Sequence, residues 1–168
     1  MTKRVVSDHL RFGVGEFTRI PPPIRSGVDR IELSEFTHIV SAGGENFVKS
    51  VFTSAERDYC EARIDRLATR FAAKEAMTKA LGTGIRGLSL REIEVVSAPN
   101  GQPEMRLHDR AYERALSLGI IAISVSLTHT SSMAEAFVVT LTDALSPAFI
   151  PPQFQEEMYL GQFKAFSQ

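Results

Sequence analysis

The stretch from Arg70 to Gly84, RFAAKEAMTKALGTG, constrains the fold of this chain more than any other stretch. Between Arg63 and Leu81 most residues are good helix formers that lose little side-chain entropy in a helix, and neither Gly nor Pro interrupts them. Gly82 follows, and glycine suits the left-handed conformation that ends many helices. The sequence therefore predicts a helix over residues 63–81, the longest in the chain.

Glu75 is expected to point toward the core from this helix. At 100° per residue it falls on the same stripe as Leu67, Ala68 and Phe71. A buried, ionised carboxylate is strongly unfavourable unless it is paired, protonated or bound to a cation. The sequence therefore predicts that Glu75 has a specific partner.

Two partners for Glu75 remain open from this helix alone. Lys79 lies four residues on, in the order that favours an ion pair worth roughly 0.2–0.5 kcal/mol on an exposed helix. Alternatively, Glu75 holds a metal ion, and Arg70, Lys74 and Lys79 flank it as anchors for phosphate oxygens. The second interpretation requires another acid elsewhere in the chain.

Composition narrows the class of protein. A chain of 168 residues with 43% hydrophobic and 23% charged residues is long enough for one globular core. The net charge of −1 gives no global basic field for nucleic acid. The single Cys60 cannot form an internal disulfide, and the longest mostly apolar run, Leu118 to Leu127, is far shorter than the ~20 residues of a membrane helix. We expect a cytoplasmic protein that binds neither nucleic acid nor membrane.

The candidate for the other acid is Asp29. Residues 1–23 are expected to form an N-terminal arm that closes on Pro21–Pro23, because three prolines in a row are extended and donate no ladder hydrogen bonds. The segment Ile24–Leu33 predicts a strand that bends at Gly27 and leads into a short helix. From local sequence alone, Asp29 fits a turn or helix-capping aspartate as well as it fits a metal ligand.

The remaining patterns predict two further helices and four strands. Thr53 and Glu56 have the spacing of a capping box that opens a helix. A hairpin is expected around Asn100-Gly101, then a helix over 109–118, then strands over 120–127 and 133–141. The pattern indicates an α+β fold, with an antiparallel sheet packed on the long central helix.

In the expected strand over 120–127, alternation places four apolar residues on a single buried face: Ile121, Ile123, Val125 and Leu127. His129 follows at the tip of this strand, where a histidine is commonly a solvated loop residue. The pattern G-x-G-x-x-G over Gly82–Gly87 is no dinucleotide fingerprint, because it follows a helix instead of opening one. Its glycines still allow a ligand to approach the backbone amides.

The C-terminal tail, residues 143–168, has a different composition. It contains three prolines and a series of aromatic residues: Phe149, Phe154, Tyr159, Phe163 and Phe166. Aromatic side chains at this density are sticky when exposed. We expect this segment to dock on its own chain or on a partner.

Three blocks in the expected order resemble the holo-acyl-carrier-protein synthase family, the short, single-repeat class of 4′-phosphopantetheinyl transferases. They are Gly27-Val28-Asp29, the stretch Arg70–Gly84 and the strand end Ser124–His129. The resemblance covers residues 24–142, which are expected to form the transferase domain. It implies the fold of that family.

The resemblance implies a magnesium-dependent transferase. Asp29 and Glu75 are 46 positions apart, close to the family's usual separation of its two metal-binding acids. The resemblance implies that both acids, with waters and the pyrophosphate oxygens of coenzyme A, hold Mg2+. The reaction would move the phosphopantetheine arm of coenzyme A to a serine of an acyl carrier protein or carrier domain and leave adenosine 3′,5′-bisphosphate.

The resemblance also assigns roles to individual residues. Asp29, Lys74 and Glu75 would be catalytic: Lys74 neutralises charge on the phosphoryl group with the metal, and Glu75 accepts the serine proton directly or through water. Coenzyme A would be bound by Arg70, Lys74, Lys79, Gly82, Thr83, Gly84, Thr128 and His129. Relatives often form trimers, so His129 is expected to reach the ligand from a neighbouring subunit.

Two departures from the family pattern concern the first strand and the partner. Arg25 stands where many relatives have glycine, which predicts a distorted first strand. Glu35 stands where many relatives have an arginine that pairs with the carrier, so Arg57, Arg63 or Arg66 would meet an acidic carrier instead.

Two alternatives to the enzyme stay open. In one, the chain is a non-catalytic relative that binds coenzyme A or a carrier as a regulatory or assembly module. In the other, these residues are ordinary core and surface charges of an unrelated α+β domain.

Overall fold

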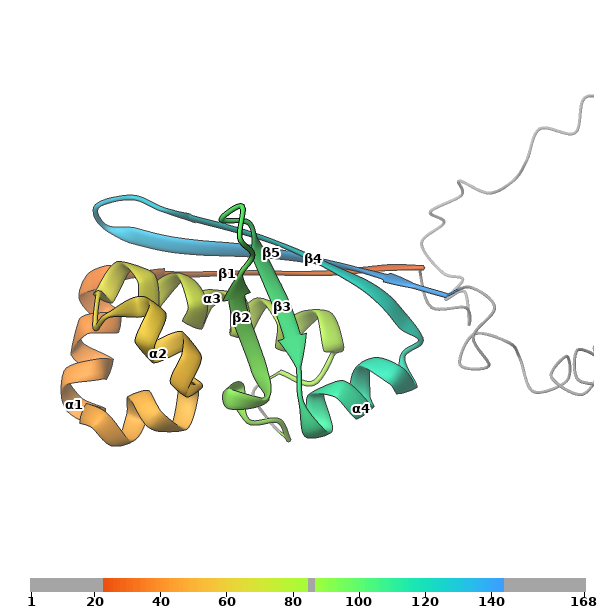
Figure 1. The fold of residues 1–168 in the computed structure, drawn as a ribbon, viewed down its shortest axis with the longest axis horizontal. Helices are drawn as coiled ribbons and strands as arrows, with labels where there is room; N and C mark the ends of the chain where they lie inside the picture. The colour runs from red at the N-terminus through yellow and green to blue at the C-terminus, as the bar shows by residue number, and fades with distance from the viewer. Residues whose placement is uncertain (1–22, 85–86, 144–168) are drawn as a thin grey trace, which may run out of the picture.

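The computed structural model describes residues 23–84 and 87–143. The expectations for the N-terminal arm fall on residues outside these ranges, as do those for nearly all of the C-terminal tail. A three-stranded antiparallel sheet lies over one long helix, α3 (Figure 1). The strand order is β1-β5-β4, formed by Ile24–Glu32, Met133–Thr142 and Ile120–His129.

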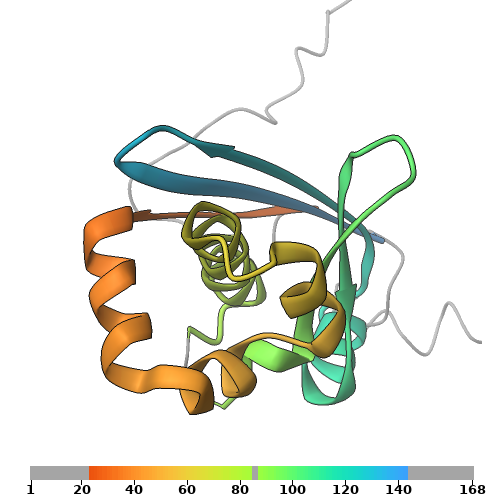
Figure 2. The ribbon, with the colours of Figure 1, turned by 60° about the vertical axis from the view of Figure 1, so that its left-hand side comes forward.

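The remaining elements surround α3, which spans Ile64–Leu81. They are α1 (Leu33–Val51), α2 (Ser54–Cys60), the 3-10 helix η1 (Leu90–Glu92), β2 (Ile93–Ser97), β3 (Pro103–Leu107) and α4 (Asp109–Ser117). Helices α1 and α2 lie at one end of the molecule and α4 at the other, with the β2–β3 hairpin between them (Figure 1). Figure 2 shows α3 under the three-stranded sheet, between α1 on one side and the β2–β3 hairpin on the other. Two hydrophobic clusters fill the space between α3 and its neighbours. The predicted α+β class is confirmed.

The central helix confirms most of its prediction. It ends at Leu81, and Gly82 adopts the left-handed conformation with φ 70° and ψ 20°. Helix α1 is one residue longer, 19 against 18, but Gly44 interrupts it with non-helical angles. The helix expected to be short after the first strand is therefore long and kinked, and α3 is the longest unbroken helix among the described residues.

Strand β1 is straight, which corrects two expectations. It pairs with β5 without interruption from Ile24 opposite Leu141 to Glu32 opposite Met133, so neither Gly27 nor Arg25 bends it. Gly27 has another purpose: a Cβ atom there would overlap the carbonyl oxygen of Ala76 on α3. Because glycine has no Cβ, the strand can lie directly against the helix.

Arg25 fits this arrangement without distorting it. Its Nε donates to the Ala80 carbonyl at 2.6 Å, near the end of α3 where helical carbonyls lack intrahelical partners. The arginine therefore ties β1 to the last turn of α3.

Strand β4 departs from simple alternation near its start. Its pairing with β5 shifts between Ile120 and Ala122, so Ile121 has no partner residue and is 64% exposed. The expectation that Ile121 shares the buried face of Ile123 is wrong, because a bulge redirects the side chain. Val125 keeps its predicted buried position.

Lys74 is fully buried, which corrects the expectation that it contacts phosphate. Its Nζ is 2.8 Å from Glu56 Oε2, 3.0 Å from the Leu90 carbonyl, and also donates to the Ile93 carbonyl. Glu56 is equally buried and accepts hydrogen bonds from the backbone N–H groups of Thr53 and Val95. All three donors of Lys74 are used inside the protein, so the ion pair joins α2, α3 and β2.

No helix within residues 23–84 and 87–143 is long and apolar enough to cross a membrane.

The buried ion pair generates a stability prediction. Lys74→Ala should lower the free energy of unfolding by about 3–5 kcal/mol, because it leaves the buried Glu56 charge without its cation. Urea denaturation followed by circular dichroism measures the loss.

The matched control is Lys79→Ala on the same helix. The Lys79 side chain is 50% exposed, and removing an exposed ion pair should cost no more than about 1 kcal/mol. Equal losses for the two variants would contradict the structural role of Lys74.

Candidate active site

Asp29 of β1 and Glu75 of α3 meet where the strand crosses the helix. Asp29 comes two residues after Gly27, and its alternation with Gly27 and Ile31 turns it toward α3. Glu75 is 8% exposed, which confirms that it points inward. Its Oε1 atom is buried and has no hydrogen-bond partner among the described residues.

The electrostatics of this pair are unusual. Burial raises the pKa of Glu75, the nearby charge of Asp29 raises it further, and Lys79 opposes both. Lys79 Nζ lies 2.7 Å from Asp29 Oδ1 and 2.7 Å from the Val28 carbonyl. Lys79 therefore pairs with Asp29, and the ion pair that helix spacing predicts between Lys79 and Glu75 is not the main contact.

The two acids fit a divalent cation that a ligand helps to hold. An orphaned, desolvated carboxylate oxygen beside a second carboxylate is an arrangement that a cation stabilises. No group of three or more His, Cys, Asp or Glu side chains within residues 23–84 and 87–143 forms a complete metal site. Mg2+ commonly takes only one or two carboxylates and fills its other positions with water and substrate phosphate.

Asp29 and Lys79 border an open pocket at the edge of the sheet. The pocket has a volume of about 380 Å³ and is lined by Val28, Asp29, Arg30, Lys79 and Glu135. The loop Gly82–Gly84 follows α3 within one turn of Lys79, so it lies at the same end of the helix. We call the region formed by Asp29, Glu75, Lys79 and the Gly82–Gly84 loop the acid edge.

A second pocket gathers three arginines at the opposite edge of the sheet. It has a volume of about 440 Å³ and lies between α2, the first half of α3, the β2–β3 turn and the tip of β4. We call it the arginine pocket; its charged residues are Arg63, Asp65, Arg66, Arg70 and His129.

Arg70 anchors the arginine pocket. The Arg70 guanidinium carbon lies 4.2 Å from the Tyr59 ring centre and that of Arg66 lies 5.3 Å from it, so both guanidinium groups stack near one aromatic ring. Arg70 Nε is buried and has no hydrogen-bond partner among the described residues. An unpaired, buried N–H of a cation suits an anion such as phosphate.

His129 lies in the arginine pocket, away from Asp29. Its Nε2 is 3.7 Å from Asp65 Oδ2. The hydrogen bond from Arg63 is the main cause that lowers the pKa of Asp65 to about 2, so Asp65 is ionised at neutral pH. Three arginines outnumber the two acids beside them, Asp65 and Glu61, and leave the pocket positive.

The structure thus divides the predicted site residues between two places. It brings Asp29, Glu75 and Lys79 together at the acid edge, and Arg70 and His129 together in the arginine pocket. Strand β5 separates β1 from β4, so at a strand spacing of ~4.8 Å the two edges are about 10 Å apart. Thr128 is exposed and alternates with His129, which turns it to the opposite face of the sheet.

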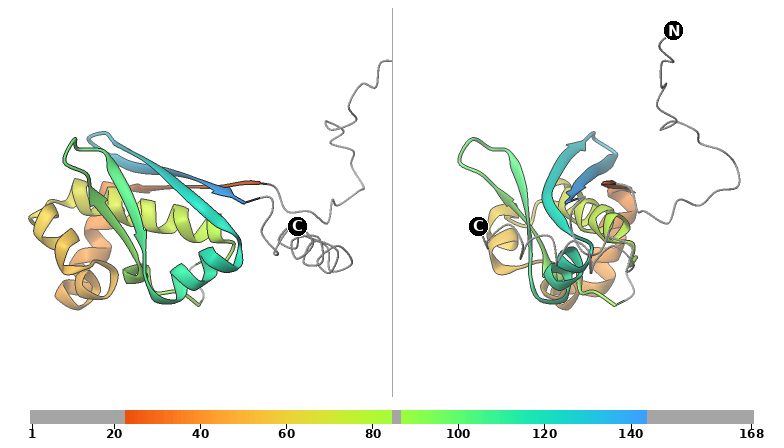
Figure 3. Two further views of the ribbon diagram at one scale, coloured as in Figure 1. Left: turned by 45° about the vertical axis from the view of Figure 1, so that its right-hand side comes forward. Right: turned by 90° about the vertical axis from the view of Figure 1, so that its right-hand side faces the viewer.

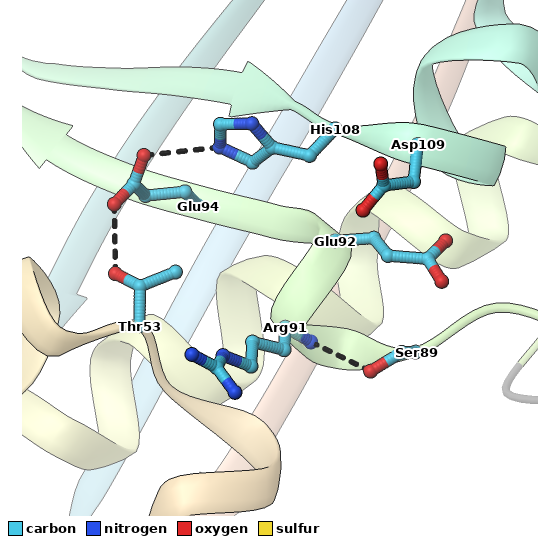
Figure 4. Close-up of a pocket in the computed structure, with 7 residues that line it drawn as sticks. All are labelled: Thr53, Ser89, Arg91, Glu92, Glu94, His108 and Asp109. Carbon is cyan, nitrogen blue, oxygen red and sulfur yellow. Dashed lines mark hydrogen bonds and ion pairs between the residues drawn. The ribbon is translucent and has the colours of Figure 1, made fainter.

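A third pocket holds polar residues, of which the sequence patterns singled out only Thr53 (Figure 4). Glu94 accepts a hydrogen bond from the Thr53 hydroxyl at 2.7 Å and lies 3.1 Å from His108 Nε2. Burial acts to raise the pKa of Glu94, but these two hydrogen bonds lower it overall. These groups satisfy one another and join the start of α2 to the β2–β3 hairpin.

Local sequence patterns indicate these contacts only in part. Thr53 and Glu56 form the predicted capping box, with both reciprocal hydrogen bonds present. The box does not reveal that Glu56 also binds Lys74 and that Thr53 also binds Glu94. A clue was available in the lysine itself, because Lys74 lies among alanines in a helix that packs on several sides.

Comparisons with known proteins agree with this geometry. The sequence model of the 4′-phosphopantetheinyl transferase superfamily matches residues 25–142. A holo-[acyl-carrier-protein] synthase of Herpetosiphon aurantiacus is 45% identical over an alignment of 121 positions, and the match covers 68% of this chain and 95% of the relative. The corresponding protein of Chloroflexus aurantiacus is 43% identical over an alignment of 129 positions, and the match covers 67% of this chain and 94% of the relative.

Solved structures of the same kind superpose on this fold. The Neisseria meningitidis holo-[acyl-carrier-protein] synthase has a TM-score of 0.63 at 33% identity, with 69% of this chain and 96% of that chain covered. The Helicobacter pylori synthase in complex with coenzyme A has a TM-score of 0.63 at 28% identity, with 68% and 98% covered.

These matches span nearly the whole of each relative and over two thirds of this chain. They exclude an unrelated α+β domain. Together with the fold, they show that the chain belongs to the holo-[acyl-carrier-protein] synthase family of the 4′-phosphopantetheinyl transferase superfamily.

Proposed function

We propose that this protein transfers 4′-phosphopantetheine from coenzyme A to a serine of an apo acyl carrier protein or carrier domain. The transfer requires Mg2+ and releases adenosine 3′,5′-bisphosphate. The observation that carries this proposal is the buried, unpartnered Glu75 oxygen beside Asp29 in a chain of this family. Relatives with the same fold have been crystallised with coenzyme A, which supports the choice of substrate.

Asp29 and Glu75 would hold the Mg2+ ion. When bound, Mg2+ supplies positive charge that neutralises phosphate oxygens during transfer. Glu75 is also our candidate for the group that accepts the serine proton, because its Oε1 has no protein hydrogen bond to give up. Lys79 is half exposed and can move from Asp29 to a phosphate oxygen of the substrate.

Lys74 is not part of this proposal, because its ammonium is enclosed by Glu56 and two carbonyls. The Gly82–Gly84 loop stays in it as a backbone contact for the ligand. Its glycines are exposed, and Gly82 and Gly84 both have positive φ, so the amides there carry no bulky side chain.

The arginine pocket would bind the 3′-phosphate of coenzyme A. A phosphate needs several charge-assisted donors, and Arg66, Arg70 and His129 supply them in one place. Because the acid edge and the arginine pocket lie on opposite edges of the sheet, one chain does not present both at one point. Two neighbouring copies, each turning a different edge to the interface, would form a complete site.

We therefore propose a homotrimer with sites between subunits. An interface that joins two different edges is heterologous, and such an interface forms a ring when the rotation between subunits closes. The outward face of the sheet supplies apolar surface for the contact: Ile24 and Val28 of β1 are 55% and 50% exposed, and their β5 partners Leu141 and Phe137 are 45% and 48% exposed. A ring that packs these faces together would bury them.

The carrier would bind differently from that of many relatives. Glu35 lies exposed in the first turn of α1, where an arginine would attract an acidic carrier. Arg63 already pairs with Asp65, and Arg66 with Glu61, at the mouth of the arginine pocket. Of the three candidate arginines, only Arg57 lies outside the arginine pocket, where it donates to the Thr53 carbonyl at 3.4 Å.

The test of function is a mass-spectrometric transfer assay. The purified chain is incubated with Mg2+, coenzyme A and a panel of apo carriers from fatty-acid, polyketide and peptide synthases. We expect one carrier to gain the mass of phosphopantetheine. Binding of coenzyme A by isothermal titration, without any mass gain across the panel, would favour the non-catalytic alternative.

The acid pair generates an activity prediction. Glu75→Gln should reduce transfer at least about 100-fold, because the amide neither accepts the serine proton nor holds Mg2+ well. Asp29→Asn should have a similar effect. Circular dichroism confirms that each variant is folded, and normal activity in either variant would remove that acid from the mechanism.

Glu75→Gln should also stabilise the protein in the absence of metal. In EDTA at pH 7, Glu75→Gln removes a desolvated charge that Asp29 repels, so the free energy of unfolding should rise by on the order of 1 kcal/mol. A raised native pKa means that protonation favours the folded state, so the difference shrinks as the pH falls toward the ordinary value of 4.5. Denaturation at pH 7.5 and pH 4 measures it; an unchanged or opposite difference would contradict the raised pKa.

Shared sites generate a complementation prediction. Asp29→Asn and Arg70→Ala damage different edges, so subunits mixed in one ring restore an interface with both edges intact. We expect each variant alone to be impaired and the mixture to recover activity. The matched control mixes Asp29→Asn with Glu75→Gln, which damage the same edge and should not recover. Native mass spectrometry checks that mixed rings form; mixed rings without recovery would contradict shared sites.

A further inference from the structure

Strand β3, helix α4 and the start of β4 lie together at the end of the molecule opposite α1 (Figure 3). An apolar groove is lined by residues of these three elements. Its volume is about 510 Å³, and its apolar lining includes Met105, Leu107, Tyr112, Leu116, Ile121 and Ile123. Three of these side chains are more than half exposed: Tyr112 at 53%, Leu116 at 55% and Ile121 at 64%. Contiguous exposed apolar surface of this kind commonly marks a contact site.

The β4 bulge builds this groove. The register shift between Ile120 and Ala122 leaves Ile121 without a residue opposite on β5 and turns its side chain outward. Bulges commonly redirect one side chain at the edge of a sheet. Ile121 and Leu116 of α4 both line the groove. Neither residue takes part in the proposed transfer.

The chain leaves the described structure beside this groove. The backbone N–H of Asp143 donates to the Gly119 carbonyl at 2.8 Å, and Gly119 immediately precedes the groove residue Ile120. After Asp143 the sequence continues through residues 144–168, which contain Phe149, Phe154, Tyr159, Phe163 and Phe166. A segment rich in aromatic side chains therefore starts at the rim of an apolar groove.

We propose that the groove binds the aromatic part of the chain's own C-terminal tail, between Phe149 and Phe166. Phe149 lies six residue steps after Asp143, and these span up to ~20 Å when extended, which is ample for a groove that begins next to Asp143. A short tether also keeps the local concentration of the segment near the millimolar range. Modest apolar contact is then enough for the segment to stay bound.

The arrangement favours the tail over a second copy of the chain. The family match ends at residue 142, before the tail. The match to the Herpetosiphon aurantiacus relative covers 95% of that protein but only 68% of this chain, so the tail is an addition to the part that the two proteins share. Charge agrees as well: Arg106 is exposed on the groove lining, and the tail carries Glu156 and Glu157 between its aromatic residues.

Tryptophan fluorescence of the full chain tests the proposal, because the chain contains no tryptophan. Single substitutions Phe149→Trp, Phe154→Trp and Phe163→Trp each introduce one reporter into the tail. We expect blue-shifted emission and protection from acrylamide quenching in at least one of them. Adding Leu116→Glu should return that reporter to the emission of a water-exposed indole, because a charge would enter the apolar groove.

The matched control is Ser117→Glu, which places the same charge on the adjacent, exposed residue of α4 that does not line the groove. It should leave the blue shift unchanged. Solvent-like emission from all three reporters would overturn the proposal, and so would equal responses to Leu116→Glu and Ser117→Glu. Emission that turns solvent-like on dilution from micromolar to nanomolar protein would assign the groove to a second copy and also overturn it.

Discussion

The close approach of β1 to α3 is the constraint on which the proposed site depends. Gly27 permits it, because any larger residue would collide with the Ala76 carbonyl. Once the strand lies against the helix, Asp29 comes near Glu75 without any loop or ligand to guide it. The site is therefore built on the two most regular elements of the fold, which hold side chains more precisely than loops do.

Local sequence patterns predicted the elements well, because their signals are local too. The capping box at Thr53 and the glycine stop at Gly82 use hydrogen bonds and backbone angles within a few residues. The inward direction of Glu75 follows from helical periodicity in the same way. The meeting of Asp29 with Glu75 required the family resemblance, since 46 residues separate them and local sequence allowed Asp29 to be a turn residue.

The patterns failed where the outcome depends on a distant neighbour. Periodicity places Lys74 on a face of α3, but only the packing of α2 decides that this face meets Glu56. Alternation likewise places Ile121 with Ile123, and it cannot show a bulge that arises in pairing with β5. Local sequence likewise suggests a bend at Gly27, because the atom that demands a glycine there belongs to Ala76 on another element.

The buried pair of Lys74 and Glu56 affects how the most recognisable stretch of this family should be interpreted. Adjacent residues in that stretch have separate roles: Lys74 stabilises the fold through Glu56, while Glu75 lies beside Asp29 at the acid edge. A substitution of Lys74 that abolished catalysis would therefore be explained by loss of the fold as readily as by loss of a catalytic group. Assigning chemistry to a diagnostic lysine in homologous enzymes calls for a folding measurement beside every rate.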